Sequence, residues 1–269
     1  MDFSVDHFFT IGKTHKVCED YALSGSEPFL YLIVADGCSS SPHTDIGARI
    51  LAHIAKDILI TCDRDIDYKG LGLLTIKLAR QTISSLGLPY SCLDSTLLVA
   101  FEKGNCWTAF LYGDGSIIYK QENSYPHMSS TSYSSNMPYY LSYWSDLARK
   151  EVYKKANVLL KLSHKNLDGG DCQSYQLNYD FEHQRIYEDC SLLILCTDGI
   201  ESFTSTMDSS YQYPVASSLV NIKTTKGEFI KRRAGRMLKN LSDDHNVYPM
   251  DDFSVAAYVR RDYKCPPIM

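Results

Sequence analysis

The sequence predicts an α+β fold with a single domain that spans residues 1–262. Segments with strand character follow one another in runs, whereas helical periodicity is confined to separate blocks, which is typical of α+β proteins. Hydrophobic residues make up 44% of the 269 residues, so the chain is able to bury a sizeable core. No repeat and no interdomain linker is visible, and residues 263–269 are expected to form a short tail.

Ten short segments are predicted as strands, because apolar, β-branched and aromatic residues dominate them and turn residues bound most of them. They lie at residues 3–11, 19–23, 29–35, 95–101, 106–112, 116–120, 158–162, 175–186, 191–196 and 253–259. The third, 29–35, is a continuous apolar run and predicts a buried strand. The strands between residues 95 and 120 are joined by short turns, so we expect an antiparallel meander.

Two consecutive helices are expected between the third and fourth strands, and we expect them to be antiparallel. From Thr44 to about residue 59, apolar residues recur at helical spacing. A second helix is predicted from about Leu71 to Leu86, before Gly87 and Pro89. Its predicted apolar face includes Leu74, Leu78 and Ile83. A further helical pattern at residues 229–241 carries a basic face, which is expected to be solvated.

Residues 121–150 differ in composition from the rest of the chain, being rich in Ser, Tyr, Asn, Pro and Met. We expect this stretch to be a surface insertion. A long segment of this kind inside a compact domain is typically a lid or recognition flap. The alternative is a tyrosine-rich patch that packs on its own sheet.

The charge balance and the cysteine pattern exclude several functional classes. A net charge of −5 provides no basic field for nucleic acid but leaves carboxylates for hard cations. The nine cysteines contain no Cys-x-x-Cys pair, which disfavours a zinc ribbon and indicates reduced thiols. The chain shows neither a signal peptide nor a membrane-spanning apolar stretch, so we expect a cytoplasmic monomer that binds no membrane.

An apolar strand followed by Asp-Gly occurs three times, at Asp36, Asp114 and Asp198. Further acids, Glu19-Asp20 and Asp251-Asp252, open two other strands. Carboxylates at strand ends can converge on one rim of a sheet, and a divalent cation between them offsets their repulsion. A set of oxygen ligands favours magnesium or manganese over zinc. Each glycine is expected to permit a sharp turn and to expose its carbonyl as a further ligand. Ordinary turn chemistry is the simpler explanation for any one Asp-Gly pair.

The ordered set of short motifs resembles the metal-dependent serine/threonine protein phosphatases of the 2C type. The motifs are Glu19-Asp20, Asp36-Gly37, Asp94-Ser95-Thr96, Gly113-Asp114-Gly115, Thr197-Asp198-Gly199 and Asp251-Asp252-Phe253-Ser254-Val255. The resemblance extends from about Gly12 to Val259 and includes the helix pair. It implies a four-layer α-β-β-α sandwich, with two central, mostly antiparallel sheets flanked by helix pairs and with metals at one end.

The resemblance also implies a role for each acidic residue. Asp36 would bridge two ions, Mg2+ or Mn2+, and the Gly37 carbonyl would bind one of them. Asp198 and Asp251 would hold the other ion, and the catalytic role of Asp36 and Asp198 would be exerted through a metal-activated water. Glu19 and Asp20 would act mostly through metal-bound waters, and Asp114 would support a third ion.

The chain departs from the family pattern at several positions near the predicted site. His15 stands where the family usually has the arginine that clamps the substrate phosphate, and Lys16 and Arg49 are alternative cations. Cys38 follows Asp36-Gly37 in place of the usual histidine or methionine. Residues 39–41 are serines, which either donate hydrogen bonds to phosphate or shape the loop. Ser202, beside Glu201, takes the place of a carboxylate for the third ion.

The predicted function is hydrolysis of phosphoserine and phosphothreonine in a protein substrate, which we expect to be a kinase or its target. The alternative is a phosphatase-like module that binds a phosphorylated partner but turns over poorly, motivated by His15. A third hypothesis, in which the Asp-Gly pairs are only turns, is disfavoured by the matching order of the motifs.

Overall fold

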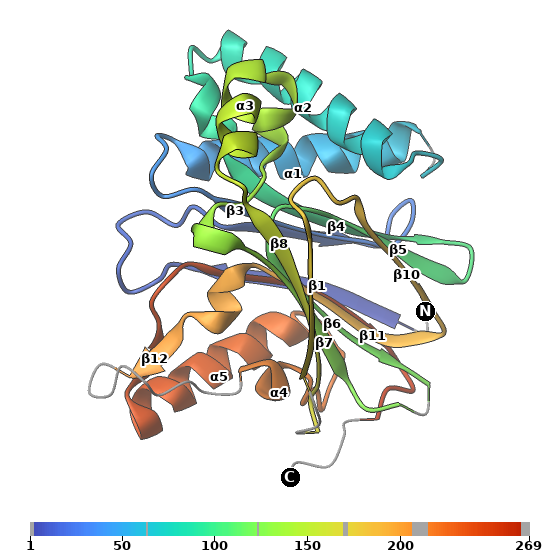
Figure 1. Ribbon diagram of the computed structural model, residues 1–269. Coiled ribbons are helices and arrows are strands. Elements are labelled where there is room, and N and C mark those ends of the chain that lie inside the picture. Colours follow the sequence, from blue (N-terminus) through green and yellow to red (C-terminus); the bar gives the residue numbers. More distant parts are fainter. Residues whose placement is uncertain (1–2, 63, 123, 169–171, 206–214, 265–269) are drawn as a thin grey trace.

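Two antiparallel sheets stacked face to face form the centre of the molecule (Figure 1). The computed structural model describes residues 3–62, 64–122, 124–168, 172–205 and 215–264. The larger sheet has the order β1 (Phe3–Thr10), β14 (Phe253–Arg260), β11 (Cys190–Cys196), β6 (Gly115–Gln121), β7 (His127–Tyr133), β8 (Leu159–Asn166), β9 (Cys172–Asn178). The smaller sheet has the order β10 (His183–Glu188), β5 (Cys106–Tyr112), β4 (Ser95–Lys103), β3 (Tyr31–Gly37), β2 (Tyr21–Gly25).

Helices cover the outer faces of both sheets, as Figure 1 shows. The antiparallel pair α1 (Thr44–Thr61) and α2 (Tyr68–Ser85) lies on the smaller sheet, and α4 (Val215–Leu219) and α5 (Phe229–His245) lie on the larger one. A shorter helix, α3 (Leu147–Lys155), lies near α2. This order of layers confirms the predicted α+β class and the four-layer sandwich.

Three apolar layers hold the sandwich together, and β3 contributes to two of them. Its residues Ile33 and Ala35 pack against α1 and α2, whereas Leu32 and Val34 face the larger sheet between the two sheets. Successive side chains in a strand point to opposite faces, so a strand buried on both sides must be apolar throughout. This explains the continuous apolar run before Asp36. A third apolar layer lies between the larger sheet and helices α4 and α5.

Two expectations about individual elements were wrong. The buried face of α2 is formed by Leu71, Thr75, Ile76, Ala79 and Ile83, whereas Leu74 and Leu78 are 38% and 39% exposed. Helical spacing allows either face, and contact with the smaller sheet selects between them. The predicted strand 175–186 is the end of β9 and the start of β10, which belong to different sheets. The turn at 179–182 joins the two strands. It was not predicted, because the alternating pattern continues through these residues without a strong turn signal.

The stretch 121–150 contains an internal strand of the larger sheet. β7 pairs with β6 on one side and with β8 on the other. Residues after it form the short helices η2 (Ser134–Asn136) and η3 (Leu141–Ser145) before α3 begins. Leu141 is fully buried against α2, and Tyr139 packs in a small cluster with Tyr153 and Val158. Residues 134–155, which run from the end of β7 to the end of α3, are called the flap below. The boundary of the domain at residue 262 stays a prediction, and residues 265–269 of the expected tail lie outside the described residues.

Smaller features complete the fold. The helix η1 (Tyr90–Leu93) precedes β4, η4 (Asp198–Glu201) follows β11, and a two-stranded ribbon joins β12 (Phe203–Ser205) to β13 (Val247–Pro249). Eight cysteines lie in the described residues and all are free thiols, whereas Cys265 lies outside them. Within the described part of the chain, no helix combines the length and apolar character needed to cross a bilayer.

Candidate functional site

Five aspartates lie at strand ends and belong to one electrostatically linked group. Asp36 is the penultimate residue of β3, Asp198 follows β11 at the start of η4, and Asp114 lies between β5 and β6. Asp20 directly precedes β2, and Asp251 precedes β14. Each of them changes the pKa of at least one other member of the group, through its charge or, for Asp36, through a hydrogen bond. The fold therefore brings together acids that are far apart in sequence.

Burial and mutual repulsion make these carboxylates hard to ionise. Burial raises the pKa of Asp36 well above its usual range, and the charges of Asp20, Asp198 and Asp114 raise it further. Burial does the same to Asp114, with additional repulsion from Asp198 and Asp251. The pKa of Asp198 is raised by burial, and its carboxyl lies within hydrogen-bonding reach of Asp36. A cation placed among the carboxylate oxygens would stabilise their ionised form and offset this repulsion.

The donors in this group fit a hard divalent cation. The Oδ2 atom of Asp20 accepts a hydrogen bond of 2.7 Å from Thr197 Oγ1, whereas its buried Oδ1 atom has no hydrogen-bond partner. Among the described residues, no Lys, Arg or His side chain pairs with Asp20, Asp36, Asp114 or Asp198. Several anionic oxygens without a protein cation are the ligand set that magnesium and manganese prefer.

Asp252, to which sequence reasoning assigned no role, organises the loop that carries Glu19 and Asp20. It is buried and accepts backbone hydrogen bonds from Gly12 at 2.7 Å and from Glu19 at 2.6 Å. Glu19 itself accepts a hydrogen bond of 2.7 Å from Thr44 Oγ1, so its side chain is held against α1. The doublet at 251–252 was the available signal, since neighbouring residues of an extended segment point to opposite sides.

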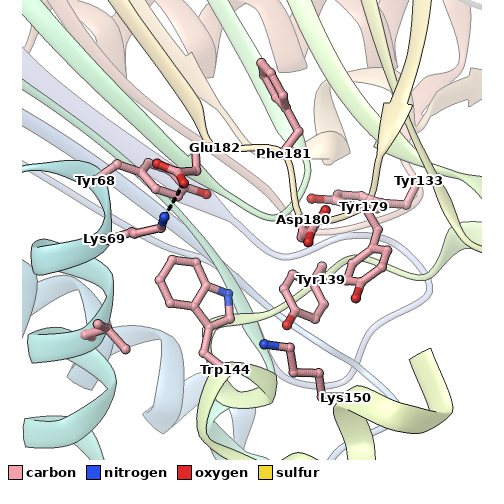
Figure 2. Close-up of a pocket in the computed structure, with 11 residues that line it drawn as sticks. Tyr68, Lys69, Tyr133, Tyr139, Trp144, Lys150, Tyr179, Asp180, Phe181 and Glu182 are labelled. Carbon is pink, nitrogen blue, oxygen red and sulfur yellow. Dashed lines mark ion pairs between the residues drawn. The ribbon is translucent and has the colours of Figure 1, made fainter. Parts of the chain in front are cut away.

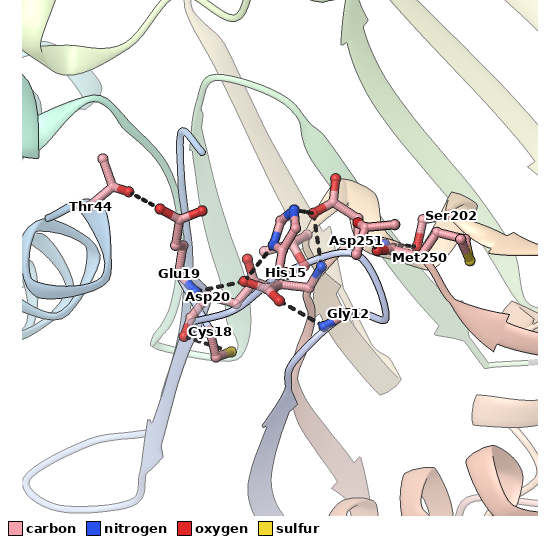
Figure 3. Close-up of polar contacts among 12 residues, drawn as sticks. Gly12, His15, Cys18, Glu19, Asp20, Thr44, Ser202, Met250 and Asp251 are labelled. Atoms are coloured by element: carbon pink, nitrogen blue, oxygen red, sulfur yellow. Dashed lines mark hydrogen bonds and ion pairs between the residues drawn. The ribbon is translucent and has the colours of Figure 1, made fainter. Parts of the chain in front are cut away.

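His15 lies between two acids of the site rather than free in solvent. Its Nε2 atom is 3.3 Å from Asp251 Oδ1, and its Nδ1 atom is 3.1 Å from Asp252 Oδ2 (Figure 3). Burial lowers the pKa of His15, but the hydrogen bond and charge of Asp252, with the charges of Asp251 and Glu19, outweigh it and raise the pKa overall. The imidazole is thereby placed in the site, and its role in phosphate binding stays a prediction.

Close packing, rather than a positive φ, explains two of the three glycines that follow Asp36, Asp114 and Asp198. A Cβ atom at Gly199 would lie 1.8 Å from the Asp252 carbonyl oxygen, and one at Gly37 would lie 2.7 Å from Thr44 Cβ. Of the three glycines at positions 37, 115 and 199, only Gly115 has a positive φ, of 132°. Close packing, and not a positive φ, therefore calls for glycine at positions 37 and 199. Backbone contact at Gly199 brings η4 directly against the segment that leads into β14.

The loop after Asp36 is attached to the rest of the site through Asp94. Ser41 Oγ donates a hydrogen bond of 2.9 Å to Asp94 Oδ2, and the Cys38 amide donates one of 2.8 Å to the Asp94 carbonyl. Cys38 Sγ and Ser40 Oγ are 3.1 Å apart. These contacts give Ser41 a part in shaping the loop, which was one of the two alternatives for the serines.

Ser202 and Glu201 extend the acidic end of the sandwich. Ser202 Oγ donates to the Gly199 carbonyl at 2.8 Å and accepts from the Asp251 amide at 3.2 Å, so it joins η4 to the start of β14. Glu201 is exposed, but its charge raises the pKa of Asp114 and Asp198. A hollow of about 370 Å³ beside them is lined in part by Thr14, Glu201, Ser202 and Asp251.

A second pocket, of about 310 Å³, lies under the flap (Figure 2). Its aromatic walls include Tyr68, Tyr133, Tyr139, Trp144 and Tyr179. Lys69 and Glu182 form an ion pair of 2.6 Å at its rim, and Lys150 lies beside Trp144 without an ion-pair partner among the described residues. Burial raises the pKa of Tyr133 in the wall of this pocket, and the charges of Tyr68, Tyr153 and Asp114 add to the rise.

A family model described as "Protein phosphatase 2C" matches residues 12–224. The chain belongs to the protein phosphatase 2C family. The match covers most of the motifs in the acidic group, and Asp251 lies beyond its end. Among curated protein sequences, none matches the chain.

Solved structures of phosphatases share the fold of this protein phosphatase 2C member. A bacterial serine phosphatase aligns with a TM-score of 0.55 and 12% identity over 97% of this chain and 98% of that one. The serine/threonine phosphatase of S. agalactiae aligns with a TM-score of 0.54 and 15% identity over 96% and 99%. The catalytic domain of the serine/threonine protein phosphatase PstP, in complex with two manganese ions, aligns with a TM-score of 0.50 and 13% identity over 97% and 99%.

Proposed function

We propose that this chain is a metal-dependent phosphoprotein phosphatase that hydrolyses phosphoserine and phosphothreonine with two divalent cations, Mg2+ or Mn2+, in the acidic group. The observation that carries the proposal is the convergence of buried Asp20 and Asp114 with half-buried Asp36 and Asp198, without a basic partner among the described residues. A cation is the usual means of keeping such a group ionised. Membership of the protein phosphatase 2C family supports the same function.

In this proposal each acid has a role toward the cations. Asp36 would contact both cations, the Gly37 carbonyl would help hold one of them, and Asp198 and Asp251 would hold the other. Glu19 and Asp20 would act mostly through water, and Asp114 would support a third ion. When bound, the cations would lower the pKa of a coordinated water and offset the charge of the phosphoryl oxygens.

The protein's own contribution is to hold these acids in place before substrate arrives. Asp252 fixes residues 12–19 through two backbone hydrogen bonds, of 2.7 and 2.6 Å. Ser202 holds the Asp251 amide against η4, and the contact at Gly199 sets the spacing between Asp198 and Asp251. Because these supports are rigid, little reorganisation is needed when charge develops on the phosphoryl group.

The substrate we propose is a phosphorylated protein, such as a kinase or the target of one. The aromatic pocket under the flap supports this, because the charge of Asp114 still influences Tyr133 in its wall and its volume offers room for a side chain of a polypeptide. A small phosphate ester would not use it. A cytoplasmic location and a monomeric state stay predictions.

One observation favours a second function, the binding of a phosphorylated partner with little turnover. His15 is engaged by Asp251 and Asp252, so it is not free to clamp a phosphate as the family's arginine does. In this alternative the cations still attract phosphate, but the phosphoryl group is poorly oriented for hydrolysis.

Phosphate release from a phosphothreonine peptide tests the proposal. We expect turnover with Mn2+, none with chelator, and a loss of at least about 100-fold in Asp36→Asn and Asp198→Asn. Asp65→Asn is the matched control, because the Asp65 side chain is 91% exposed and pairs only with Lys103. Metal-independent turnover, or full activity in either site variant, contradicts the proposal. Metal-dependent binding of the peptide without turnover supports the second function.

A further inference from the structure

The site lacks an arginine at the position where the family usually has its phosphate clamp, and His15, Arg49 and Lys13 contact other groups. His15 contacts Asp251 and Asp252. The Arg49 guanidinium carbon lies 5.1 Å from the centre of the Tyr21 ring, and Lys13 Nζ lies 3.7 Å from that of Tyr248. Phosphate recognition generally uses the planar fork of an arginine, which makes two parallel hydrogen bonds to phosphoryl oxygens. A different arginine therefore has to be sought near the acidic group.

Asp94 holds such an arginine beside the loop that follows Asp36. Arg149 Nη2, from helix α3 of the flap, lies 2.6 Å from Asp94 Oδ2. The same oxygen accepts the hydrogen bond from Ser41, and Asp94 Oδ1 accepts one of 2.7 Å from Ser142. The Asp94 side chain is 3% exposed and the Arg149 side chain 30% exposed. One buried carboxylate thus joins the flap to the loop at residues 38–41.

The register of the smaller sheet places this contact close to Asp36. In the pairing of β3 with β4, Asp36 lies opposite Thr96 and Gly37 lies opposite Ser95. Asp94 is therefore two residues along the strand from the partner of Asp36, which is about 7 Å at the rise of an antiparallel strand. The Arg149 side chain reaches Asp94 from the flap, so the guanidinium lies at the edge of the acidic group.

Two tyrosines of the flap connect Arg149 with the same place from the other side. The Arg149 guanidinium carbon lies 4.2 Å from the centre of the Tyr143 ring, and the Tyr143 and Tyr140 rings are 5.5 Å apart in an edge-to-face contact. Burial raises the pKa of Tyr140, and the charges of Asp114 and Asp36 add to the rise. Cys38, in the loop after Asp36, raises the pKa of Tyr140 more than these aspartates do, so the chain of contacts Arg149–Tyr143–Tyr140 runs toward that loop.

We propose that Arg149 binds the phosphoryl oxygens of the substrate and supplies the arginine that the chain lacks at position 15. The proposal rests on the proposed phosphatase function. The guanidinium has five N–H donors, of which the contact with Asp94 uses one, so donors remain for an incoming phosphate. Asp94 orients the side chain, and the flap becomes the element that delivers the phosphate-binding residue. Substrate binding is thereby coupled to the position of the flap.

Kinetics with a phosphothreonine peptide and with inorganic phosphate as a product inhibitor test this role. We expect Arg149→Gln to raise KM for the peptide and KI for phosphate by about 10- to 100-fold, with a smaller effect on kcat. Arg149→Lys keeps the charge but not the fork, and should recover part of the loss. Arg80→Gln is the matched control, because Arg80 also lies over a tyrosine ring, 4.7 Å from the centre of Tyr90, and should leave both constants within twofold.

Two results overturn the proposal. One is a KI for phosphate in Arg149→Gln within twofold of the wild-type value. The other is a fall in kcat and thermal stability with an unchanged KI, which would show that Arg149 only fastens the flap.

Calorimetric titration of the manganese-loaded protein with inorganic phosphate separates this proposal from the proposed function. If the wild-type protein releases no phosphate from the peptide, the phosphatase function fails. The titration still judges Arg149, because weaker binding in Arg149→Gln supports its role and equal binding overturns it. Absence of phosphate binding by the wild-type protein overturns both.

Discussion

Replacing Asp36 by asparagine is expected to stabilise the metal-free protein and to abolish its stabilisation by manganese. Asp36 is a half-buried residue, and the pKa of its carboxyl group is raised by desolvation and by the charges of Asp20, Asp198 and Asp114. The folded state therefore holds a proton more tightly than the unfolded state does. Stability from this group is present below the unfolded-state pKa, about 3.9, and is lost as the pH rises through the folded-state pKa.

The expected gain follows from the electrostatics of the site. Two unit charges about 4 Å apart repel by about 4 kcal/mol at an effective dielectric constant of about 20. Protonation relieves part of this repulsion, so we expect Asp36→Asn to gain about 1–3 kcal/mol at pH 8 and nothing at pH 4. Manganese at about 100 times its Kd should stabilise the wild-type protein by about 2.7 kcal/mol, or about 5–10 °C in Tm.

Urea unfolding and thermal scans between pH 4 and pH 8, with chelator and then with Mn2+, measure both effects. The variant should gain less than about 2 °C from the metal, because it lacks the proposed bridging ligand. Asp65→Asn should match the wild-type protein under all conditions, since its carboxylate is 91% exposed. Equal or lower stability of Asp36→Asn in chelator at pH 8, or full manganese stabilisation of that variant, would refute the reasoning.

Three further predictions test the packing and titration of the fold. Gly199→Ala should lower the free energy of unfolding in urea by about 2–4 kcal/mol and kcat by at least about tenfold, because the new Cβ would lie 1.8 Å from a backbone oxygen. Gly235→Ala is the control and should not destabilise the protein, because there is open space around Gly235. Leu71→Ala should cost about 2–5 kcal/mol in the same assay, whereas Leu74→Ala, at a 38% exposed position, should cost less than about 1 kcal/mol; equal costs would contradict the assigned face of α2. Burial lowers the pKa of His183 to about 3, so the unfolded state binds more protons below pH 6.5. Relative to His183→Gln, the wild-type protein should lose about 1.4 kcal/mol for each pH unit below about 6, and parallel pH profiles would contradict this.

The local pattern of the sequence predicted those elements whose environment is uniform along their length. Strand β5 has the predicted bounds, 106–112, and α1 begins at the predicted Thr44. The pattern did not predict which face of a helix is buried when both faces carry apolar residues. Both faces of α2 carry leucines, so only contact with the smaller sheet decides that Leu71 is buried and Leu74 is not.

The candidate site shows the same division. A cluster of carboxylates suited to a divalent cation was predictable from three repeated Asp-Gly signals, because carboxylates at strand ends can converge on one rim of a sheet. The hydrogen bonds that fix the site were not predictable. Asp252 accepts a hydrogen bond from Gly12, which is 240 positions away in the sequence. Asp94 joins the loop after Asp36 to Arg149. Neither contact leaves a local signature, because each depends on the register and stacking of distant strands.

The sequence alone therefore determined the class of fold, most of its strands and the acidic character of the site, since each follows from the spacing of residue types along the chain. The tertiary structure alone decided which acids meet and which side chains orient them. It also decided that His15 lies between two carboxylates while Arg149 of the flap pairs with Asp94. The physical reason is that a shift of one residue in the pairing of a strand reverses all its side chains, and long-range packing selects the register.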